Sequence, residues 1–358
     1  MVSAMVVPLL AGCRRWAHGV VFGRVHNAAP AAFRELERRA ARITARHEAV
    51  LTMPGCAVCG ADAAALRTAV AGTRPFGRRL YPGAPALPFG VVRLPLLYRE
   101  CGTCGAARIA PTFRDRWIDA VGATSPEAAA DHWMEDPAYV EDKQRSIATH
   151  CERADVARFR SARNSVLDVS SGAGVGLEVL RECFGWRDCR GIECDPTAVR
   201  IARERRGLDV AQGLLHTVAL PEGHFDLAVL DNTLEHHADP RQALRLVRRA
   251  LRRGGAVLIV VPNFHGHSVE LLGIDYWNLN WGHWHYFTPQ SLARLLRDAG
   301  FAVERLQCSG VEQVTADRLG AVAQVGAHVE LDGDAVAALA PHDRRMRGDY
   351  VSALAIAT

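Results

Sequence analysis

The sequence predicts an α/β fold, in which an open and mostly parallel sheet carries helices on both faces. Residues 166–176 (V-L-D-V-S-S-G-A-G-V-G) read as a buried strand and a glycine-rich turn, and a helical pattern follows them. Further apolar segments at 189–194, 225–234 and 251–262 recur at intervals that each leave room for one helix. Strands that alternate with helices are typical of a parallel sheet.

The turn after the first strand is suited to a ligand. Asp168 lies in the strand, and Gly172 and Gly174 lie in the turn. Glycine has no Cβ, so a ligand can approach the backbone where the next helix presents free N–H groups. Many nucleotide sites share this pattern, and its meaning depends on the segments that follow it.

The second strand, at 189–194, places Glu193 at its carboxyl end. A carboxylate about 20 residues beyond the glycines is the position that accepts hydrogen bonds from ribose hydroxyls in this architecture. We therefore expect Glu193 to bind a ribose. The alternative is an ordinary solvated acid at the end of a strand.

Together with the segments 225–236, 251–262 and 286–301, this stretch resembles the class I S-adenosylmethionine-dependent methyltransferases in order and spacing. The resemblance implies a Rossmann-like sheet of seven strands, which antiparallel strands at 301–307 and 350–357 would close. It also implies S-adenosylmethionine as the cofactor. The cofactor-binding residues that it implies are Asp168, Ser170, Gly172, Gly174, Glu193, Asp231 and Asn232.

The chain departs from that family at two places. Ser170 stands where the family usually has its first glycine, and it narrows the turn beside the methionine end of the cofactor. We therefore expect weaker cofactor binding. After the third strand, residues 213–217 lack the acidic residue that the family often places at the adenine edge, so the adenine contact is unassigned.

Four cysteines in two C-x2-C-G frames predict a metal site. Cys56 and Cys59 form one frame, and Cys101 and Cys104 form the other. Two such turns complete a tetrahedral four-thiolate site, whose usual occupant is Zn²⁺ and whose minority occupant is iron. Four thiolates leave no open position, so the metal is expected to be structural. This arrangement ahead of the sheet resembles bacterial methyltransferases that act on sugars and secondary metabolites.

The chain is expected to contain four parts. Residues 1–52 form an extension with an amphipathic helix, 53–112 a small zinc-ribbon-like module, 113–164 a helical linker that caps the cofactor cleft, and 165–358 the methyltransferase domain. An apolar stripe at 33–50 runs along the helix of the extension. It indicates a helix packed on the body of the protein; a homodimer seam or a surface for an acidic partner is the alternative.

Composition limits the partners. The chain has 358 residues, 49% of them apolar, and a net charge of +4. Residues 1–50 carry eight arginines and three glutamates, so the rest of the chain is nearly neutral, which disfavours nucleic acid as a partner.

Ten cysteines and the lack of a long apolar run predict a cytoplasmic protein without a membrane span. Residues 10–13 resemble a lipoprotein cleavage site, but no basic residue precedes them.

The stretch 262–289 is the predicted acceptor pocket, because it is rich in aromatic residues and histidine and follows the fifth strand. Trp277, Trp281, His283 and Tyr286 are the substrate candidates, with ordinary packing as the alternative. A metal on its histidines is disfavoured, because no carboxylate lies at a suitable spacing.

Methyl transfer to a hydroxyl or carbon needs a base, and His236 and His285 are the candidates. Alternatively, Glu235 and His236 only hold the turn after the strand.

The sequence thus predicts a methyltransferase for a small hydroxylated or sugar-like acceptor. An RNA methyltransferase that grips RNA through the zinc module, and a non-catalytic zinc- and nucleoside-binding protein, are the competing hypotheses. The sequence does not distinguish O-, C- and N-methylation.

Overall fold

The computed structural model describes residues 30–48, 51–76, 92–114, 118, 133–280, 282–309, 329–332 and 348–358. Trp281 and most of the stretch 310–348 lie outside the described residues. None of the helices in the described ranges is long and apolar enough to cross a membrane.

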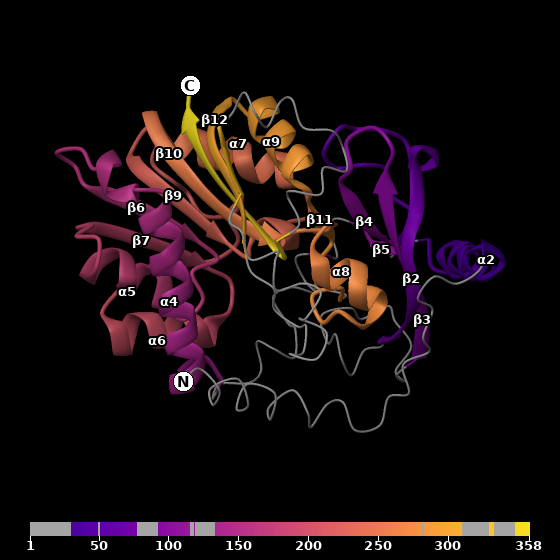
Figure 1. The fold of residues 1–358 in the computed structure, drawn as a ribbon. Coiled ribbons are helices and arrows are strands. Elements are labelled where there is room, and N and C mark those ends of the chain that lie inside the picture. The colour runs from indigo at the N-terminus through magenta and orange to yellow at the C-terminus, as the bar shows by residue number, and fades with distance from the viewer. Residues whose placement is uncertain are drawn as a thin grey trace, which may run out of the picture.

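The larger sheet has eight strands in the order β13-β12-β14-β10-β9-β6-β7-β8. Figure 1 labels its strands β12, β10, β9, β6 and β7. The five strands from β8 to β10 run parallel, whereas β14 is antiparallel to β10 and β12 is antiparallel to β14. The α/β class is therefore as predicted, and the described sheet has one strand more than the seven expected, because β13 pairs with β12. The bounds are β6 Ser165–Val169, β7 Asp188–Glu193, β8 Asp209–Gln212, β9 Phe225–Asp231, β10 Leu251–Pro262, β12 Phe301–Ser309, β13 Val329–Asp332 and β14 Tyr350–Ala357.

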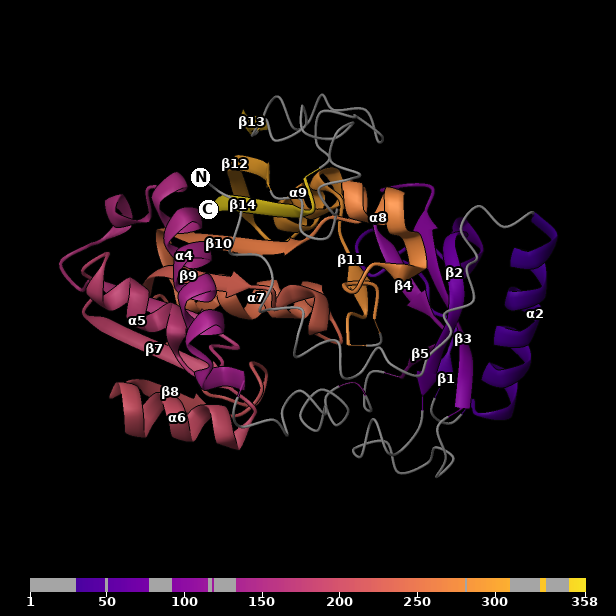
Figure 2. The same cartoon turned by 60° about the horizontal axis from the view of Figure 1, so that its bottom comes forward.

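Helices cover both faces of this sheet, because alternate strand residues are buried on opposite sides. Val166 and Leu227 pack with α4, α5 and α6 on one face. Leu167 and Ala228 pack with α7 and α9 on the other (Figure 2). The helices are α4 Pro137–Arg153, α5 Val175–Glu182, α6 Pro196–Arg206, α7 Pro240–Ala250 and α9 Pro289–Asp298, with single-turn or short helices η2 Trp133–Glu135, η3 Val156–Phe159, η4 Leu234–His236, α8 His267–Leu272 and η5 Gly273–Asp275.

Four of these helices begin in the same way. Asp136, Asp195, Asp239 and Thr288 each precede a proline and accept hydrogen bonds from the first backbone N–H groups of α4, α6, α7 and α9. Proline fits the first helical position because its missing N–H would have no partner there. These residues thus set where the four helices begin, and the cap of α6 follows almost directly on the end of β7.

A second, four-stranded sheet has the order β11-β4-β3-β2, and β1 pairs with β5 beside it. Its outer strand β11 comes from a distant part of the chain, so the predicted 53–112 module is completed by residues 285 and 286. Helix α2 packs on this sheet through Leu36 and Ala40, which contact Ala71 and Leu97 (Figure 2). The bounds are α2 Pro30–Arg46, β1 Leu51–Thr52, η1 Ala63–Ala65, β2 Leu66–Phe76, β3 Val92–Cys101, β4 Ala107–Ala110, β5 Thr112–Phe113 and β11 His285–Tyr286.

Candidate functional site

Three carboxylates lie at the carboxyl end of three neighbouring strands. Asp168 is in β6, Glu193 ends β7 and Asp231 ends β9, and β6 is hydrogen-bonded to both of the other strands. All three residues are at least nine-tenths buried. From β6 the chain adds β7 and β8 on one side and then β9 and β10 on the other, so the strand order reverses at β6. Open α/β sheets bind ligands at such a switch point.

A lysine from α4 pairs with one member of this cluster. The ammonium group of Lys143 contacts Asp231 in an ion pair. Burial disfavours the charge on Lys143, but the combined attraction of Asp231, Tyr139 and Asp168 outweighs it, and the pKa of Lys143 is raised. Burial also raises the pKa of Asp168 to about 8, although Lys143 opposes the shift.

Lys143 was predicted only as part of the capping linker, and a role at this site was missed. The sequence did hold a signal, because Lys143 is the only lysine among 43 basic residues. A chain that otherwise uses arginine throughout retains a compact ammonium group at one buried position.

Glu193 shapes the glycine turn. One of its carboxylate oxygens accepts a hydrogen bond from the backbone N–H of Gly172 (2.8 Å), and the other accepts bonds from Cys194 (2.7 Å) and Asp195 (2.9 Å). The turn at 170–174 is therefore held against the end of β7. A solvated strand-end acid would not be buried and bonded in this way.

The backbone of the turn leaves room for a ligand at one glycine and demands close packing at the other. Gly172 has a φ of +55°, and a Cβ added there would meet nothing within 4 Å. Gly174 has a φ of +85°, and a Cβ there would lie 2.4 Å from Leu208 Cδ1. Ser170 adopts a φ of 56°, in the left-handed region that favours glycine. The position that departs from the family thus retains the glycine conformation.

The end of β9 is tied to the end of β6. Thr233 Oγ1 donates to the carbonyl of Val169 (3.1 Å), which joins the two strand ends at the switch point. Asn232 also has a positive φ of 50°, and its amide donates to Asp231 (3.2 Å). Asp231 and Asn232 therefore lie side by side at the end of β9, the strand that pairs with β6 and Asp168.

Glu235, His236 and His283 come together directly beyond β9. Glu235 is fully buried, and burial raises the pKa of its carboxyl to about 8. The rings of His236 and His283 are 4.6 Å apart and nearly perpendicular, and burial lowers the pKa of both. His236 as a residue remains exposed to solvent, although its ring lies against that of His283.

His236 presents a defined ring nitrogen. Its Nδ1 lies 2.9 Å from the carbonyl of Gly282, which can only accept, so Nδ1 carries the proton and Nε2 keeps a lone pair. Glu235 was expected only to hold the turn, and its role in this cluster was missed. No local pattern indicates it, because its partner His283 lies far away in the sequence.

The other residues of the aromatic stretch lie in different surroundings. His285 is buried in β11, and its Nε2 donates to the carbonyl of Ala238 (3.3 Å). Tyr286 is buried beside it and donates to the carbonyl of Asn278 (3.0 Å), which matches the packing alternative. Trp277 is 50% exposed.

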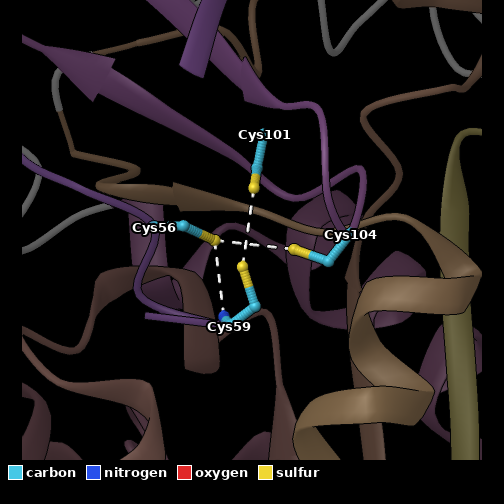
Figure 3. A group of neighbouring side chains, drawn as sticks. All are labelled: Cys56, Cys59, Cys101 and Cys104. Atoms are coloured by element: carbon cyan, nitrogen blue, oxygen red, sulfur yellow. Dashed lines mark hydrogen bonds between the residues drawn. The ribbon is translucent and has the colours of Figure 1, made fainter. Parts of the chain in front are cut away.

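The four cysteines converge on one point, as Figure 3 shows. Cys56 and Cys104 have their sulfurs 3.5 Å apart, as do Cys59 and Cys101. A tetrahedral Zn²⁺ with Zn–S bonds of about 2.3 Å places its sulfurs roughly 3.8 Å apart, so the donor set fits that ion. The glycine after each pair, Gly60 or Gly105, has a positive φ.

Residues 139–306 match the family model described as a methyltransferase domain. The chain is 32% identical over 146 residues to a probable S-adenosylmethionine-dependent methyltransferase of Mycolicibacterium smegmatis, covering 40% of this chain and 54% of that one. It is 28% identical over 178 residues to a ubiquinone biosynthesis O-methyltransferase of a Methylobacterium, covering 46% and 70%. A methyltransferase structure from Thermotoga maritima aligns with a TM-score of 0.43 at 17% identity, covering 62% of this chain and 96% of that chain.

The chain spans about half the length of several curated relatives that it matches. The matched segment holds Lys143, the three carboxylates at the strand ends and the Glu235 cluster. Residues 139–306 therefore match a methyltransferase domain, and over this region the chain is similar to a probable S-adenosylmethionine-dependent enzyme.

Proposed function

We propose that the chain is an S-adenosylmethionine-dependent methyltransferase that acts on a small hydroxylated or sugar-like acceptor. One observation carries the proposal: Asp168, Glu193 and Asp231 end three neighbouring parallel strands at the switch point of a methyltransferase domain. Buried carboxylates gathered at such a point are suited to a ligand that carries hydroxyl and ammonium groups.

The residues present fit this cofactor. Gly172 leaves open space beside its backbone, and Glu193 lies next to it, where ribose hydroxyls can donate to its carboxylate. Asp231 can attract the ammonium group of the methionine part, Asp168 can accept a hydrogen bond from it, and Lys143 can attract the carboxylate of that part. When bound, the sulfonium of the cofactor supplies an electrophilic methyl group.

The acceptor would lie beyond β9, where η4 presents His236. Its Nε2 can accept the proton of an acceptor hydroxyl, because Nδ1 is held by Gly282 and the lowered pKa keeps the ring neutral. Orientation of acceptor and donor can lower the barrier by about 7–11 kcal/mol, so a rigid turn here matters as much as the base.

The four cysteines are proposed to hold a structural Zn²⁺. They offer only thiolates, and all four are used by one tetrahedral ion, so no position is left for a substrate. Arg241 of α7 donates to the carbonyls of Ala57 and Val58 within the first knuckle, which ties the module to the larger sheet.

Isothermal titration of zinc-loaded protein with S-adenosylmethionine tests the cofactor site. Wild type is expected to bind, and Glu193→Gln is expected to weaken binding at least tenfold, because it removes a charged acceptor of hydrogen bonds. Glu182→Gln, at the exposed end of α5, is the matched control and should bind as wild type does. No binding by folded wild type would contradict the proposal.

A second measurement separates the chemistry from cofactor binding. His236→Asn should lose turnover of hydroxylated acceptors and keep the affinity for S-adenosylmethionine, because His236 does not contact the carboxylates at the strand ends. Turnover that survives in His236→Asn would remove this residue from the reaction.

A further inference from the structure

Glu235, His236 and His283 form a cluster that the methyl-transfer proposal uses only in part. Glu235 and His236 lie in η4, directly after β9, and His283 lies just before β11. One ligand atom from each residue lies within 4.8 Å of those of the other two. These are a carboxylate oxygen and two imidazole nitrogens.

Two members of the cluster carry buried atoms that have no hydrogen-bond partner in another residue that the structure describes. Glu235 is 0% exposed, and neither of its carboxylate oxygens accepts a hydrogen bond from another residue that the structure describes. His283 is 7% exposed, and its Nδ1 likewise has no partner among the described residues. Burial of unpaired polar groups is strongly unfavourable, so such groups normally coordinate a cation or pair with another group.

The two segments that carry the cluster are fastened together. The backbone N–H of Trp284 donates to the carbonyl of Glu235 (3.0 Å). His236 Nδ1 donates to the carbonyl of Gly282 (2.9 Å), which leaves Nε2 as the nitrogen that can coordinate. Metal-binding histidines commonly donate their other ring N–H to a carbonyl or carboxylate, and this bond fixes the tautomer and the direction of the ring.

We propose that Glu235, His236 and His283 bind one divalent cation of the zinc class. Two imidazoles and one carboxylate are the donor set of catalytic zinc sites, whereas Mg²⁺ and Ca²⁺ prefer oxygen ligands throughout. Three protein ligands leave a fourth position open, and the exposure of His236 places an opening to solvent beside it. The cysteine cluster, in contrast, is a closed site.

The sequence alone disfavours a metal on the histidines of this stretch, because no carboxylate lies near them at a suitable spacing. The fold supplies Glu235 from a separate segment and so completes the set. The open position is suited to an acceptor hydroxyl or to its oxyanion. While the cation is bound, His236 Nε2 is a ligand and cannot serve as the base of the proposed function, so the cation itself would acidify an acceptor hydroxyl. That role depends on the proposed function, but cation binding itself does not.

Cobalt spectroscopy on full-length protein tests the site. The cysteine cluster is first filled with one equivalent of Zn²⁺, and Co²⁺ is then titrated. We expect about one equivalent of Co²⁺ to bind, with visible d–d absorption but without the intense thiolate-to-cobalt band that a cysteine site gives. Added Zn²⁺ should displace it.

Glu235→Gln and His283→Gln should each reduce the affinity for Co²⁺ by at least about 100-fold, because loss of a ligand exceeds the effect of losing a supporting hydrogen bond. His216→Gln, a change at an exposed histidine after β8, is the matched control and should bind as wild type does. Because His236 is exposed, His236→Gln provides a third variant if the buried changes prevent folding.

The proposal is overturned if zinc-filled wild type takes up no Co²⁺, or if the absorption persists in folded Glu235→Gln and His283→Gln. Titration with S-adenosylmethionine in parallel keeps the two proposals apart. Cobalt binding without cofactor binding would uphold the metal site and contradict the methyltransferase function, and the reverse result would do the opposite.

Discussion

Replacement of Ser170 by glycine should stabilise the protein. Ser170 holds a φ of 56° with an exposed side chain at the turn between β6 and α5. The left-handed conformation costs a residue with a Cβ roughly 1–2 kcal/mol. Part of this gain in the free energy of unfolding is offset, because a glycine has more conformational freedom in the unfolded chain and costs about 0.5–1 kcal/mol to order. The net expectation for Ser170→Gly is a rise of about 0.5–1 kcal/mol in the free energy of unfolding.

Urea titration of wild type and Ser170→Gly measures this difference, and two neighbouring changes serve as controls. Ser171 has no positive φ and is buried, so Ser171→Gly should lower the free energy of unfolding by about 0.5–1 kcal/mol. Asn232 also has a positive φ, but asparagine tolerates it, so Asn232→Gly should be close to neutral.

The same change tests the cofactor turn. A glycine at position 170 widens the turn beside the methionine end of the proposed cofactor, so binding of S-adenosylmethionine should tighten several-fold. If Ser170→Gly proves no more stable than Ser171→Gly, the conformational argument is refuted. If it is more stable but binds the cofactor no better, Ser170 does not restrict the site.

Three further results are expected. Lys143→Met should lower the free energy of unfolding by about 2–4 kcal/mol in urea titration, because it leaves the buried Asp231 without its ion-pair partner. This cost is below that of breaking a fully buried ion pair, since the Lys143 side chain is 26% exposed. In a double-mutant cycle with Asp231→Asn, the two changes should therefore not add. Burial raises the pKa of Asp168 to about 8, so the folded protein keeps a proton that the unfolded chain releases near pH 4. Stability should fall as pH rises between these values, and Asp168→Asn should flatten the decline in thermal melts; an unchanged slope would count against the assignment. Zinc chelation or Cys59→Ser should unfold the module, seen as a loss of protection of β3 and β4 from hydrogen exchange, whereas retained protection would argue that the metal is not needed there.

The strands of the parallel sheet could be predicted because each is a short apolar run with a turn signal after it. Burial on both faces requires such runs, and the Asp-Pro pairs mark where helices begin. The cluster of four cysteines could be predicted equally well, because two C-x2-C-G frames can bring four sulfurs to one point whatever the rest of the fold is. These features depend on local sequence alone.

The partners of the residues after β9 could not be predicted, because they are set by contacts between distant segments. Glu235 in L-E-H-H reads as an ordinary turn acid, and only the approach of residues 282–284 buries it. Composition likewise cannot separate a pocket from a core. Tyr286 and Trp277 look alike in the sequence, yet Tyr286 is buried in the core beside the four-stranded sheet and Trp277 is half exposed.

The pairing of β11 explains why a cysteine module can matter to a site in the other half of the molecule. β4 follows the second knuckle, and it pairs with β11 through Arg108 opposite His285. The backbone N–H of Ile109 in β4 also donates to the carbonyl of Trp284 (3.3 Å), and Trp284 donates to Glu235. A metal that closes the knuckles therefore fixes β4, β4 fixes residues 284–286, and these hold His283 and Glu235 in place. We therefore expect the module to support the candidate site through this path of backbone hydrogen bonds.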